Sequence, residues 1–536
     1  MSDIGIRVRW LASTTRDELE RGISNQEGDG PARPVAHNDE QNEEPDAFDY
    51  SNTGEDDIIV SDFDNNADIT TSSKPFHASH KPHRSCIEEV QLSSDGTCIF
   101  TTDHDRHFSV YPIPLDIFSP SPSEDHHDDH HPTTKPHAKP LEPYAQLQSA
   151  DPIWAFAVNP YFDLSDANTT TVLISRRGHY ISLHNALWDI SNNATTTTSN
   201  DDDVDDDTQP TTKPKTPLNI STPLTSYKLI DPLTEAYLTP LSLTFSRCGA
   251  YFYAGHQNTI SIYDVSDTYS SPITSIRTIP SARSKLKGGG VGFKGHITAL
   301  DISPPSTYSH DGILAAGSRT RFVGLYDARS GRETTHFELP GLPTSSRREH
   351  LVQDEKTGMG GNGVTQMQWS PDATYLYIAE RRSDALLIYD ARNFSVALGY
   401  CGGRKAMTNQ KMGFGLWRNP YEDVYGVGGG SGCEVWAGGT DGRVRVWRDA
   451  WKREGRVEAD EVVDVRKACG DGGVEDEEEV PVVASLVHAS GSLAIVARGH
   501  RKGLKWPGRG SDATAEEING DKEDWGRLDI LGLESD

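Results

Sequence analysis

Short runs of alternating apolar and polar residues recur along the chain. Alternation with a period of two residues is the pattern of a β-strand with one buried face. Six segments share one plan: an alternating strand, a stretch of small residues, a polar turn, and a strand that ends in an aromatic residue or a histidine. Their first strands are predicted at 87–92, 154–160, 241–246, 296–303, 364–370 and 413–417, and their terminal residues are Tyr111, His184, Tyr263, Tyr326, Tyr389 and Trp447.

A repeated unit of this kind predicts a ring of stacked sheets, because one four-stranded sheet cannot bury both of its faces alone. Strands predicted at 484–487, 493–497 and 527–531 supply a seventh unit. Its fourth strand is expected from the N-terminal region, with Asp57 to Phe63 or the stretch near Phe76 as candidates, because sharing a blade between the chain ends removes edge strands. We therefore predict an all-β fold, a seven-bladed WD-repeat β-propeller with disordered acidic tails and insertions.

Acidic residues are concentrated in low-complexity blocks. The chain of 536 residues has a net charge of −29, yet residues 281–450 carry 21 basic and 17 acidic side chains. Hydrophobic residues make up 35% of the chain, so part of it is too polar to form a packed core. We predict a mostly disordered N-terminal region over 1–80 and a propeller over 81–536, with disordered insertions near 119–142, 191–216, 341–362, 452–480 and 500–524.

Several classes of protein are disfavoured by what the sequence lacks. It has no apolar run of the ~20 residues that a membrane helix needs, and Met1 to Trp10 lack the apolar core of a secretory signal. The six cysteines are widely spaced and form no C-x-x-C pair, which favours a reducing compartment over a disulfide framework or a structural zinc site.

An enzyme is also disfavoured. Gly290 to Gly295 match the G-x-G-x-x-G pattern, but an alternating strand follows where a dinucleotide site needs a helix. The block Glu124 to His131 contains residues that can ligate zinc, yet it lies in a predicted disordered loop without the fixed surroundings that ligation needs. We predict no catalytic residue, no metal site and no cofactor.

A few residues of the repeat have the types that hold blade turns together by hydrogen bonds. These structural repeat residues are His296, Asp327, Asp390, Asp441 and Trp447. Thr440-Asp441-Gly442 followed by Trp447 is the most complete WD-type turn of the chain. We prefer this structural role to a catalytic one, because buried polar groups need partners in any case.

The ordered set of repeats resembles the telomerase Cajal body protein family of WD-repeat proteins, whose fungal branch is associated with splicing. Cys86 to Thr101 resembles the first repeat of that family, and Thr408-Asn409-Gln410-Lys411 resembles a signature between its fifth and sixth blades. Further similarity lies in short stretches of the second to fourth repeats: Pro152 to Trp154, Leu243 to Gly249, Tyr253 to Gly255, Gly295 to Leu300, Ala316 to Ser318 and Gly324 to Tyr326. The resemblance covers most of residues 83–499. It implies a non-catalytic nuclear scaffold, since animal members bind small Cajal body RNAs and telomerase RNA and carry them to nuclear bodies.

Basic residues follow the second strand of several predicted blades, on the face that also carries the connections between blades. Arginine offers forked donors and a planar surface that suit RNA. The candidate RNA-binding residues are Arg176, Arg177, Arg319, Arg321, Arg381, Arg382, Arg404, Lys405, Lys411 and Arg498. From the residues alone, arginines that merely solvate the surface explain the pattern equally well. With the resemblance, we expect a monomer that binds small nuclear or telomerase-type RNA and ribonucleoprotein proteins, with no membrane and no small-molecule substrate.

A protein-only adaptor is the alternative function. Tyr326-Asp327-Ala328-Arg329 and Tyr389-Asp390-Ala391-Arg392 approximate the W-D-x-R box of substrate receptors for cullin ubiquitin ligases. The same residues also occur in ordinary repeats, where they form hydrogen bonds at strand ends. We prefer that structural interpretation and keep the adaptor as the second hypothesis.

Overall fold

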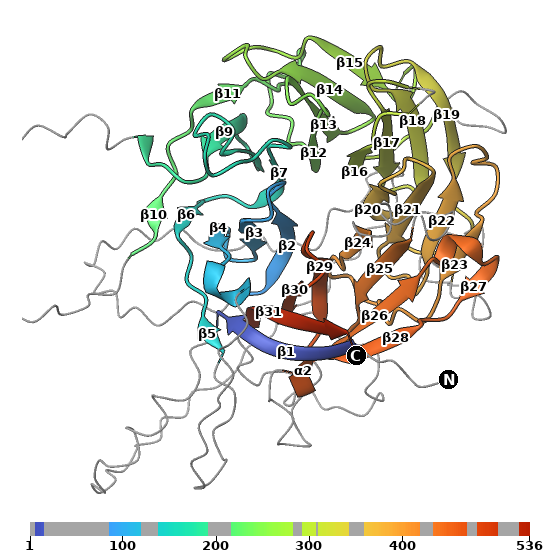
Figure 1. The fold of residues 1–536 in the computed structure, drawn as a ribbon. Helices are drawn as coiled ribbons and strands as arrows, with labels where there is room; N and C mark the ends of the chain where they lie inside the picture. Colours follow the sequence, from blue (N-terminus) through green and yellow to red (C-terminus); the bar gives the residue numbers. More distant parts are fainter. Residues whose placement is uncertain are drawn as a thin grey trace, which may run out of the picture. The chain divides into compact units, whose positions relative to one another are not determined.

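Seven sheets, each built on four antiparallel strands, form the ring of a β-propeller (Figure 1). The computed structural model describes residues 6–14, 85–118, 138–190, 216–281, 292–306, 309–341, 359–418, 432–468, 480–501 and 525–535. The propeller is one compact unit built from 1–16 and 84–536. The predicted seven-bladed all-β fold is confirmed. Most of the predicted insertions, and the N-terminal region over 17–83, lie outside the described residues.

The first four blades are formed by consecutive stretches of the chain. The first contains β2 (Ile87–Leu92), β3 (Cys98–Asp103), β4 (His107–Pro112) and β6 (Ala145–Gln148), extended by β10 (Leu218–Asn219). The second contains β7 (Ile153–Val158), β8 (Thr171–Arg176), β9 (Ile181–Asn185) and β11 (Thr225–Tyr227). The third contains β12 (Ser242–Phe245), β13 (Tyr251–His256), β14 (Thr259–Asp264) and β15 (Thr274–Arg277), and the fourth β16 (Ile297–Ile302), β17 (Ile313–Ser318), β18 (Phe322–Asp327) and β19 (Glu333–Glu338).

The last three blades follow the same plan. The fifth contains β20 (Val364–Trp369), β21 (Tyr375–Glu380), β22 (Leu386–Asp390) and β23 (Gly399–Cys401), extended by β27 (Gly455–Val457). The sixth contains β24 (Phe414–Arg418), β25 (Cys433–Gly438), β26 (Arg443–Arg448) and β28 (Glu461–Asp464). The seventh contains β29 (Val482–Val487), β30 (Leu493–His500), β31 (Trp525–Ser535) and β1 (Ile6–Ser13), extended by β5 (Lys139–Pro140). Short helices occur at η1 (Leu115–Phe118), η3 (Ala450–Lys452) and α2 (Val465–Ala468).

The N-terminal strand β1 closes the ring. It pairs antiparallel with β31, so that Trp10 faces Leu531 and Ala12 faces Ile530. The two predicted candidates, 57–63 and the stretch near 76, were wrong, because β1 occupies the position beside β31. Trp10 and Ala12 are buried while Arg7 and Arg9 are exposed, so the strand alternates as a half-buried strand should. Its charged outer residues hid this pattern in the sequence.

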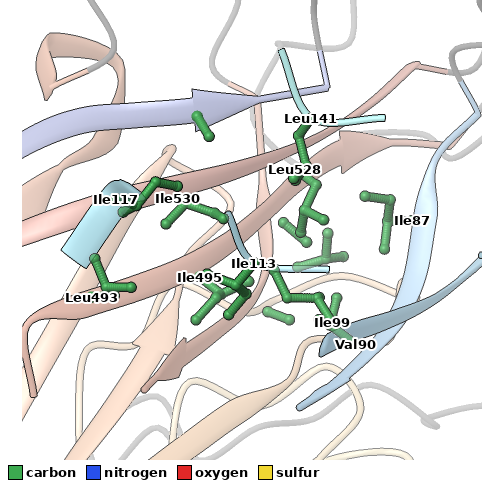
Figure 2. Packing of buried hydrophobic residues seen from close by; sticks show 14 of the residues in the cluster. Ile87, Val90, Ile99, Ile113, Ile117, Leu141, Leu493, Ile495, Leu528 and Ile530 are labelled. Atoms are coloured by element: carbon green, nitrogen blue, oxygen red, sulfur yellow. The ribbon is translucent and has the colours of Figure 1, made fainter. Parts of the chain in front are cut away.

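Apolar side chains fill every junction between neighbouring blades. The junction of the seventh and first blades packs Leu493, Ile495, Leu528 and Ile530 against Ile87 and its neighbours (Figure 2). Six further clusters occupy the other junctions in turn. First strands of neighbouring blades contact one another, for example β16 with β20 and β2 with β29, and therefore line the centre of the ring. Stacking of sheet on sheet explains why the repeats need each other.

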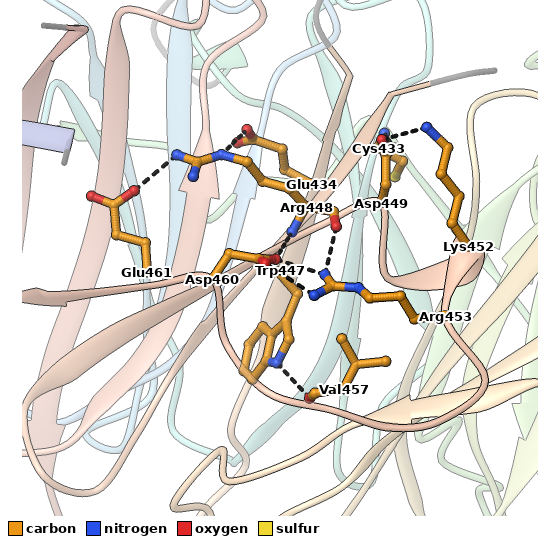
Figure 3. Close-up of polar contacts among 10 residues, drawn as sticks. All are labelled: Cys433, Glu434, Trp447, Arg448, Asp449, Lys452, Arg453, Val457, Asp460 and Glu461. Atoms are coloured by element: carbon orange, nitrogen blue, oxygen red, sulfur yellow. Dashed lines mark hydrogen bonds and ion pairs between the residues drawn. The ribbon is translucent and has the colours of Figure 1, made fainter. Parts of the chain in front are cut away.

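Two stretches predicted as disordered insertions contain ordered strands. Within 452–480, β28 supplies the fourth strand of the sixth blade, and within 119–142 the two residues of β5 pair with β1. Figure 3 shows how charged residues hold β28 in place: Arg448 donates to Glu434 (3.1 Å) and to Glu461 (2.8 Å). Arg453 likewise donates to Asp460. The same charges that suggested a solvated loop thus form ion pairs along the outer edge of the blade.

A buried histidine in the second blade makes stability depend on pH. The His184 ring contacts the Ile220 carbonyl oxygen (2.9 Å) and the Ser182 hydroxyl (2.8 Å), and burial lowers its pKa to about 4. In the unfolded chain the histidine pKa is ~6.5, so His184 becomes protonated below that pH. In the folded chain it stays neutral until the pH approaches 4, so protonation favours the unfolded state. The contribution of neutral His184 to the unfolding free energy is therefore fully present above pH ~6.5 and is lost as the pH falls toward 4.

We expect the wild-type protein to lose about 2 kcal/mol more unfolding free energy between pH 7 and pH 5 than His184→Gln does. Urea denaturation of both proteins at the two pH values measures the difference. Because other titrating groups are common to both proteins, their contributions cancel. Equal losses in the two proteins would contradict the assignment.

Candidate nucleic-acid interface

One face of the ring is formed by the turns after the second strands together with the connections between blades. In the fourth blade the Arg319 amide donates to the His296 carbonyl oxygen, and in the fifth the Arg381 amide donates to that of Gly363. Equivalent hydrogen bonds recur in the other blades, as in His104 to Cys86. We call this surface the loop face. Nine of the ten predicted RNA-binding residues belong to its turns and connections or to the strand ends beside them; the tenth, Arg498, lies within β30.

The predicted basic residues differ widely in exposure. Four of them are exposed: Arg177, Arg319, Arg381 and Lys405. Four are half-buried: Arg176, Arg321, Arg382 and Lys411. The remaining two, Arg404 and Arg498, are buried. The sequence placed these residues on one face of the fold but did not show which side chains reach its surface.

Three arginines from different blades lie close together on the loop face. Burial lowers the pKa of Arg381, and the positive charges of Arg319 and Arg501 lower it further. Arg381 keeps accessible surface and donates to the Asn409 carbonyl oxygen (2.7 Å). Glu88 is the acidic neighbour of the group, 4.0 Å from Arg501. We call Arg319, Arg381 and Arg501 the basic arc, since they come from the fourth, fifth and seventh blades.

Arg498, which was predicted to bind RNA, lies inside the seventh blade instead. The strand β30 continues to His500, so Arg498 is a strand residue rather than a turn residue. Its Nε donates to Asp529 (3.0 Å), and Arg527 donates to the other oxygen of that carboxylate (2.7 Å). The turn residue that reaches the loop face is Arg501. The sequence placed the end of the strand too early to distinguish them.

Arg404 is likewise interior. Its Nη2 donates to the carbonyl oxygens of Met412 (2.7 Å) and Gly413 (2.8 Å), and burial lowers its pKa to about 10. Arg321 holds two blades together, because its Nε and Nη2 donate to the two oxygens of buried Glu380 (2.7 and 3.2 Å). These contacts give Arg404, Arg498 and Arg321 roles inside the fold, and we leave all three out of the interface.

The segment Thr408 to Lys411 lies between the fifth and sixth blades and contacts the seventh and first blades. Gln410 Nε2 donates to the Gly499 carbonyl oxygen of the seventh blade (3.1 Å), and Lys411 contacts Glu89 of the first blade (2.8 Å). Met412 and Ala406 join the core between those two blades. The connection between the fifth and sixth blades therefore contacts the first and seventh blades, and its Asn409 carbonyl oxygen accepts the hydrogen bond from Arg381 of the basic arc.

The structural repeat residues mostly bond within their own blades. Asp441 accepts two hydrogen bonds from Arg445 (3.0 and 2.6 Å), and Trp447 Nε1 donates to the Val457 carbonyl oxygen (3.1 Å; Figure 3). Asp327 accepts from Ser330, and Asp390 accepts from Arg392. The His296 side chain makes no hydrogen bond to the part of the chain that the structure describes. Arg329 and Arg392 of the adaptor boxes lie in turns on the opposite side from the loop face.

An aromatic pair that sequence reasoning missed lies on the loop face between the second and third blades. The rings of Tyr180 and Tyr237 are 5.2 Å apart, and Tyr237 is 51% exposed. The neighbouring turn carries exposed Arg177, and the Gly178 amide in that turn approaches the Thr239 hydroxyl (3.4 Å). Aromatic rings beside arginine are the elements on which unpaired bases stack. Each tyrosine lies in a separate connection, so no local pattern pairs them.

Three turns of the loop face place an arginine in a backbone conformation that favours glycine. Arg106, Arg321 and Arg382 have φ of 69°, 68° and 55°. In the second and sixth blades, Gly178 and Gly442 adopt similar values of 71° and 72°. A left-handed conformation costs roughly 1 kcal/mol or more for a residue with a side chain. The fold tolerates that cost where a long basic side chain replaces glycine.

The described residues contain no group of three or more histidine, cysteine, aspartate or glutamate side chains that could hold a metal ion. The block Glu124 to His131 lies outside them. In the same described part of the chain, no helix has the length and hydrophobicity needed to cross a bilayer.

Comparison with known proteins finds distant relatives. No protein-family profile matches the chain. It is similar to guanine nucleotide-binding protein negative regulator 1 of Schizosaccharomyces pombe, with 27% identity over 224 residues, 42% of this chain and 46% of that protein. It is also similar to telomerase Cajal body protein 1 of Rattus norvegicus and of Mus musculus, with 22% and 21% identity over 363 residues, 67% of this chain and 51% of each relative.

These similarities support a place among the WD-repeat proteins. The identities lie below the level that would assign a particular branch, and the chain spans about half the length of the curated relatives it matches. With the seven-bladed ring, they support a WD-repeat scaffold at a coarse level.

Proposed function

We propose that the protein is a non-catalytic nuclear scaffold that binds a small structured RNA, or its ribonucleoprotein, through the loop face. The observation that carries the proposal is the convergence of Arg319, Arg381 and Arg501 from three blades. Like charges held together repel one another, and a phosphate backbone neutralises them with release of counterions. The similarity to telomerase Cajal body protein 1 supports RNA as the partner and the nucleus as the location.

Two kinds of contact on the loop face suit such an RNA. The guanidinium groups of the basic arc offer forked donors to phosphate oxygens, which position the RNA without reading its sequence. The pair Tyr180 and Tyr237 offers stacking surfaces for unpaired bases in a loop or bulge. A stem with an unpaired loop presents both features. We therefore favour an RNA hairpin over a continuous duplex or an unstructured strand.

The salt dependence of RNA binding tests the basic arc. We expect the double substitution Arg319→Gln with Arg381→Gln to weaken binding of a synthetic RNA hairpin and to reduce the slope of log K against log salt by about 1.5. Fluorescence anisotropy of the labelled hairpin over a salt series measures both quantities. The matched control is Arg329→Gln with Arg392→Gln, which removes two exposed arginines from the opposite turns.

An unchanged slope in the first variant would overturn the basic arc as the site. Crosslinking and sequencing of RNA from cells that express the tagged protein tests the function itself. Enrichment of small nuclear or telomerase-type RNA, lost with the Gln variant, is the expected result. Absence of enrichment, together with loss of ligase binding in the Arg329 and Arg392 variant, would instead establish the cullin adaptor.

Base stacking on the tyrosine pair has a separate signature. We expect Tyr237→Ala to weaken binding of the hairpin by about 1–3 kcal/mol while leaving the salt slope unchanged, because stacking involves no phosphate charge. Tyr237→Phe keeps the ring and should bind as the wild type does. The same anisotropy titrations measure both variants, and equal weakening by Phe and Ala would show that the hydroxyl acts instead.

A further inference from the structure

The side of the ring opposite the loop face exposes large apolar side chains on three neighbouring blades. This opposite face consists of the turns between first and second strands and between third and fourth strands. In the first three blades its turns expose a group that we call the apolar arc: Leu115, Phe118, Tyr144, Tyr161, Leu164, Trp188, Leu224, Tyr251, Tyr269 and Ile273. Among the described residues, the corresponding turns of the fourth to seventh blades expose one such side chain, Val396.

The turns that carry the apolar arc contact turns of neighbouring blades. The Leu164 amide of the second blade donates to the Asp95 carboxylate of the first (3.2 Å). Tyr161 packs against the third blade, where a Cβ added to Gly249 would lie 3.2 Å from its ring. The Phe118 ring lies 5.2 Å from that of His488 in the seventh blade. Large apolar side chains gathered on one exposed face mark interaction sites on soluble proteins.

The charges around the apolar arc are negative. Acidic side chains in these turns include Asp95, Asp163, Asp166, Asp264 and Asp267. Hydrogen bonds from Ser165 lower the pKa of Asp163 and so keep its carboxylate ionised. The basic side chains in the described parts of the same turns are already engaged: Lys139 pairs with Asp116, and Arg247 donates to carbonyl oxygens of the fourth blade.

We propose that the apolar arc docks a segment of a partner protein in which arginine or lysine alternates with large apolar residues. Charge complementarity selects this occupant, because basic side chains would face Asp95 and Asp163 while apolar ones cover Tyr161 and Leu164. RNA is disfavoured by its own negative charge. The acidic runs of this chain near 124–129 and 201–207 are disfavoured as occupants for the same reason. The protein would then hold RNA on the loop face and a protein on the opposite face.

A synthetic peptide serves as the probe, and the full chain serves as its target. A fluorescent peptide of alternating arginine and leucine or phenylalanine is titrated in parallel with a matched peptide that carries glutamate in place of arginine. We expect the arginine peptide to bind, and Tyr161→Ser with Leu164→Ser to raise its Kd about tenfold or more. The matched control, Val396→Ser with Val462→Ser, removes two exposed apolar residues from other blades and should leave the Kd unchanged.

Thermal melting shows whether the Ser variants keep the wild-type fold, which we expect for exposed positions. Equal binding of the glutamate peptide, or equal Kd values in the Tyr161 and Leu164 variant and the wild type, would overturn the proposal. Concentration-dependent self-association in sedimentation, abolished by the same variant, would assign the surface to a second copy of this chain and overturn it as well. Hairpin RNA binding should be unchanged by the Ser variants, so failure here is distinguishable from failure of the RNA scaffold.

Discussion

Asp529→Ala should lower the unfolding free energy by about 3–5 kcal/mol, which is the usual result of removing one partner from a buried ion pair. The Asp529 carboxylate is fully buried and accepts hydrogen bonds from Arg498 (3.0 Å), Arg527 (2.7 Å) and Trp10 Nε1 (3.1 Å). Removing it leaves two buried guanidinium groups without the carboxylate that they share. The same hydrogen bonds join Trp10 of β1 to Asp529 of β31, so the substitution also weakens the closure of the ring.

A second variant separates loss of charge balance from loss of packing. Replacing all three charged residues together, by Arg498→Met, Arg527→Met and Asp529→Leu, removes the ions and leaves apolar side chains of similar size. We expect this triple variant to be more stable than Asp529→Ala alone, because no uncompensated charge stays buried. Urea denaturation followed by tryptophan fluorescence measures all three proteins. An unfolding free energy of Asp529→Ala within about 1 kcal/mol of the wild-type value would contradict this account.

The inner strands could be predicted from the sequence because burial on one face produces alternation. The strand predicted at 87–92 has the same bounds as β2, and that at 364–370 differs from β20 by one residue. Outer strands could not be found in this way. Glu333–Glu338 lies on the rim of the fourth blade with no fully buried residue, so its pattern is that of a polar loop. Pairing with a neighbour, rather than burial, makes such a segment a strand.

The sequence predicted that basic residues gather on one face of the ring, but it did not show which of their side chains reach the surface. Whether Arg498 or Arg501 reaches the surface depends on where β30 ends, and strand ends are decided by partners far away in the sequence. The pair Tyr180 and Tyr237 depends on how two connections meet. Contacts of this kind follow from tertiary packing, and they cannot be predicted from the hydrophobic pattern within one segment.

The contacts that close the ring join residues that lie far apart in the sequence. Trp10 is bound to Asp529, and Arg527 lies 4.6 Å over the Trp10 ring, although more than 500 residues separate them. After β1 the structure describes Thr14 and then resumes at Ser85, just before the first blade. Strand β1 is therefore held by its pairing with β31, by the burial of Trp10 and Ala12, and by this ionic group. These contacts are non-covalent, and they join residues 6–13 directly to residues 527–535.

Deletion of residues 1–16 should destabilise the propeller by more than about 3 kcal/mol, since burial of Trp10 alone is worth about that much. The deletion also exposes the edge of β31, and an unpaired edge strand promotes aggregation. Adding a synthetic peptide of residues 1–16 should restore the lost stability, with Trp10→Ala peptide as the inactive control. Thermal melting at increasing peptide concentration measures the rescue. If neither the deletion nor the added peptide changed the melting temperature, the ring would close without β1.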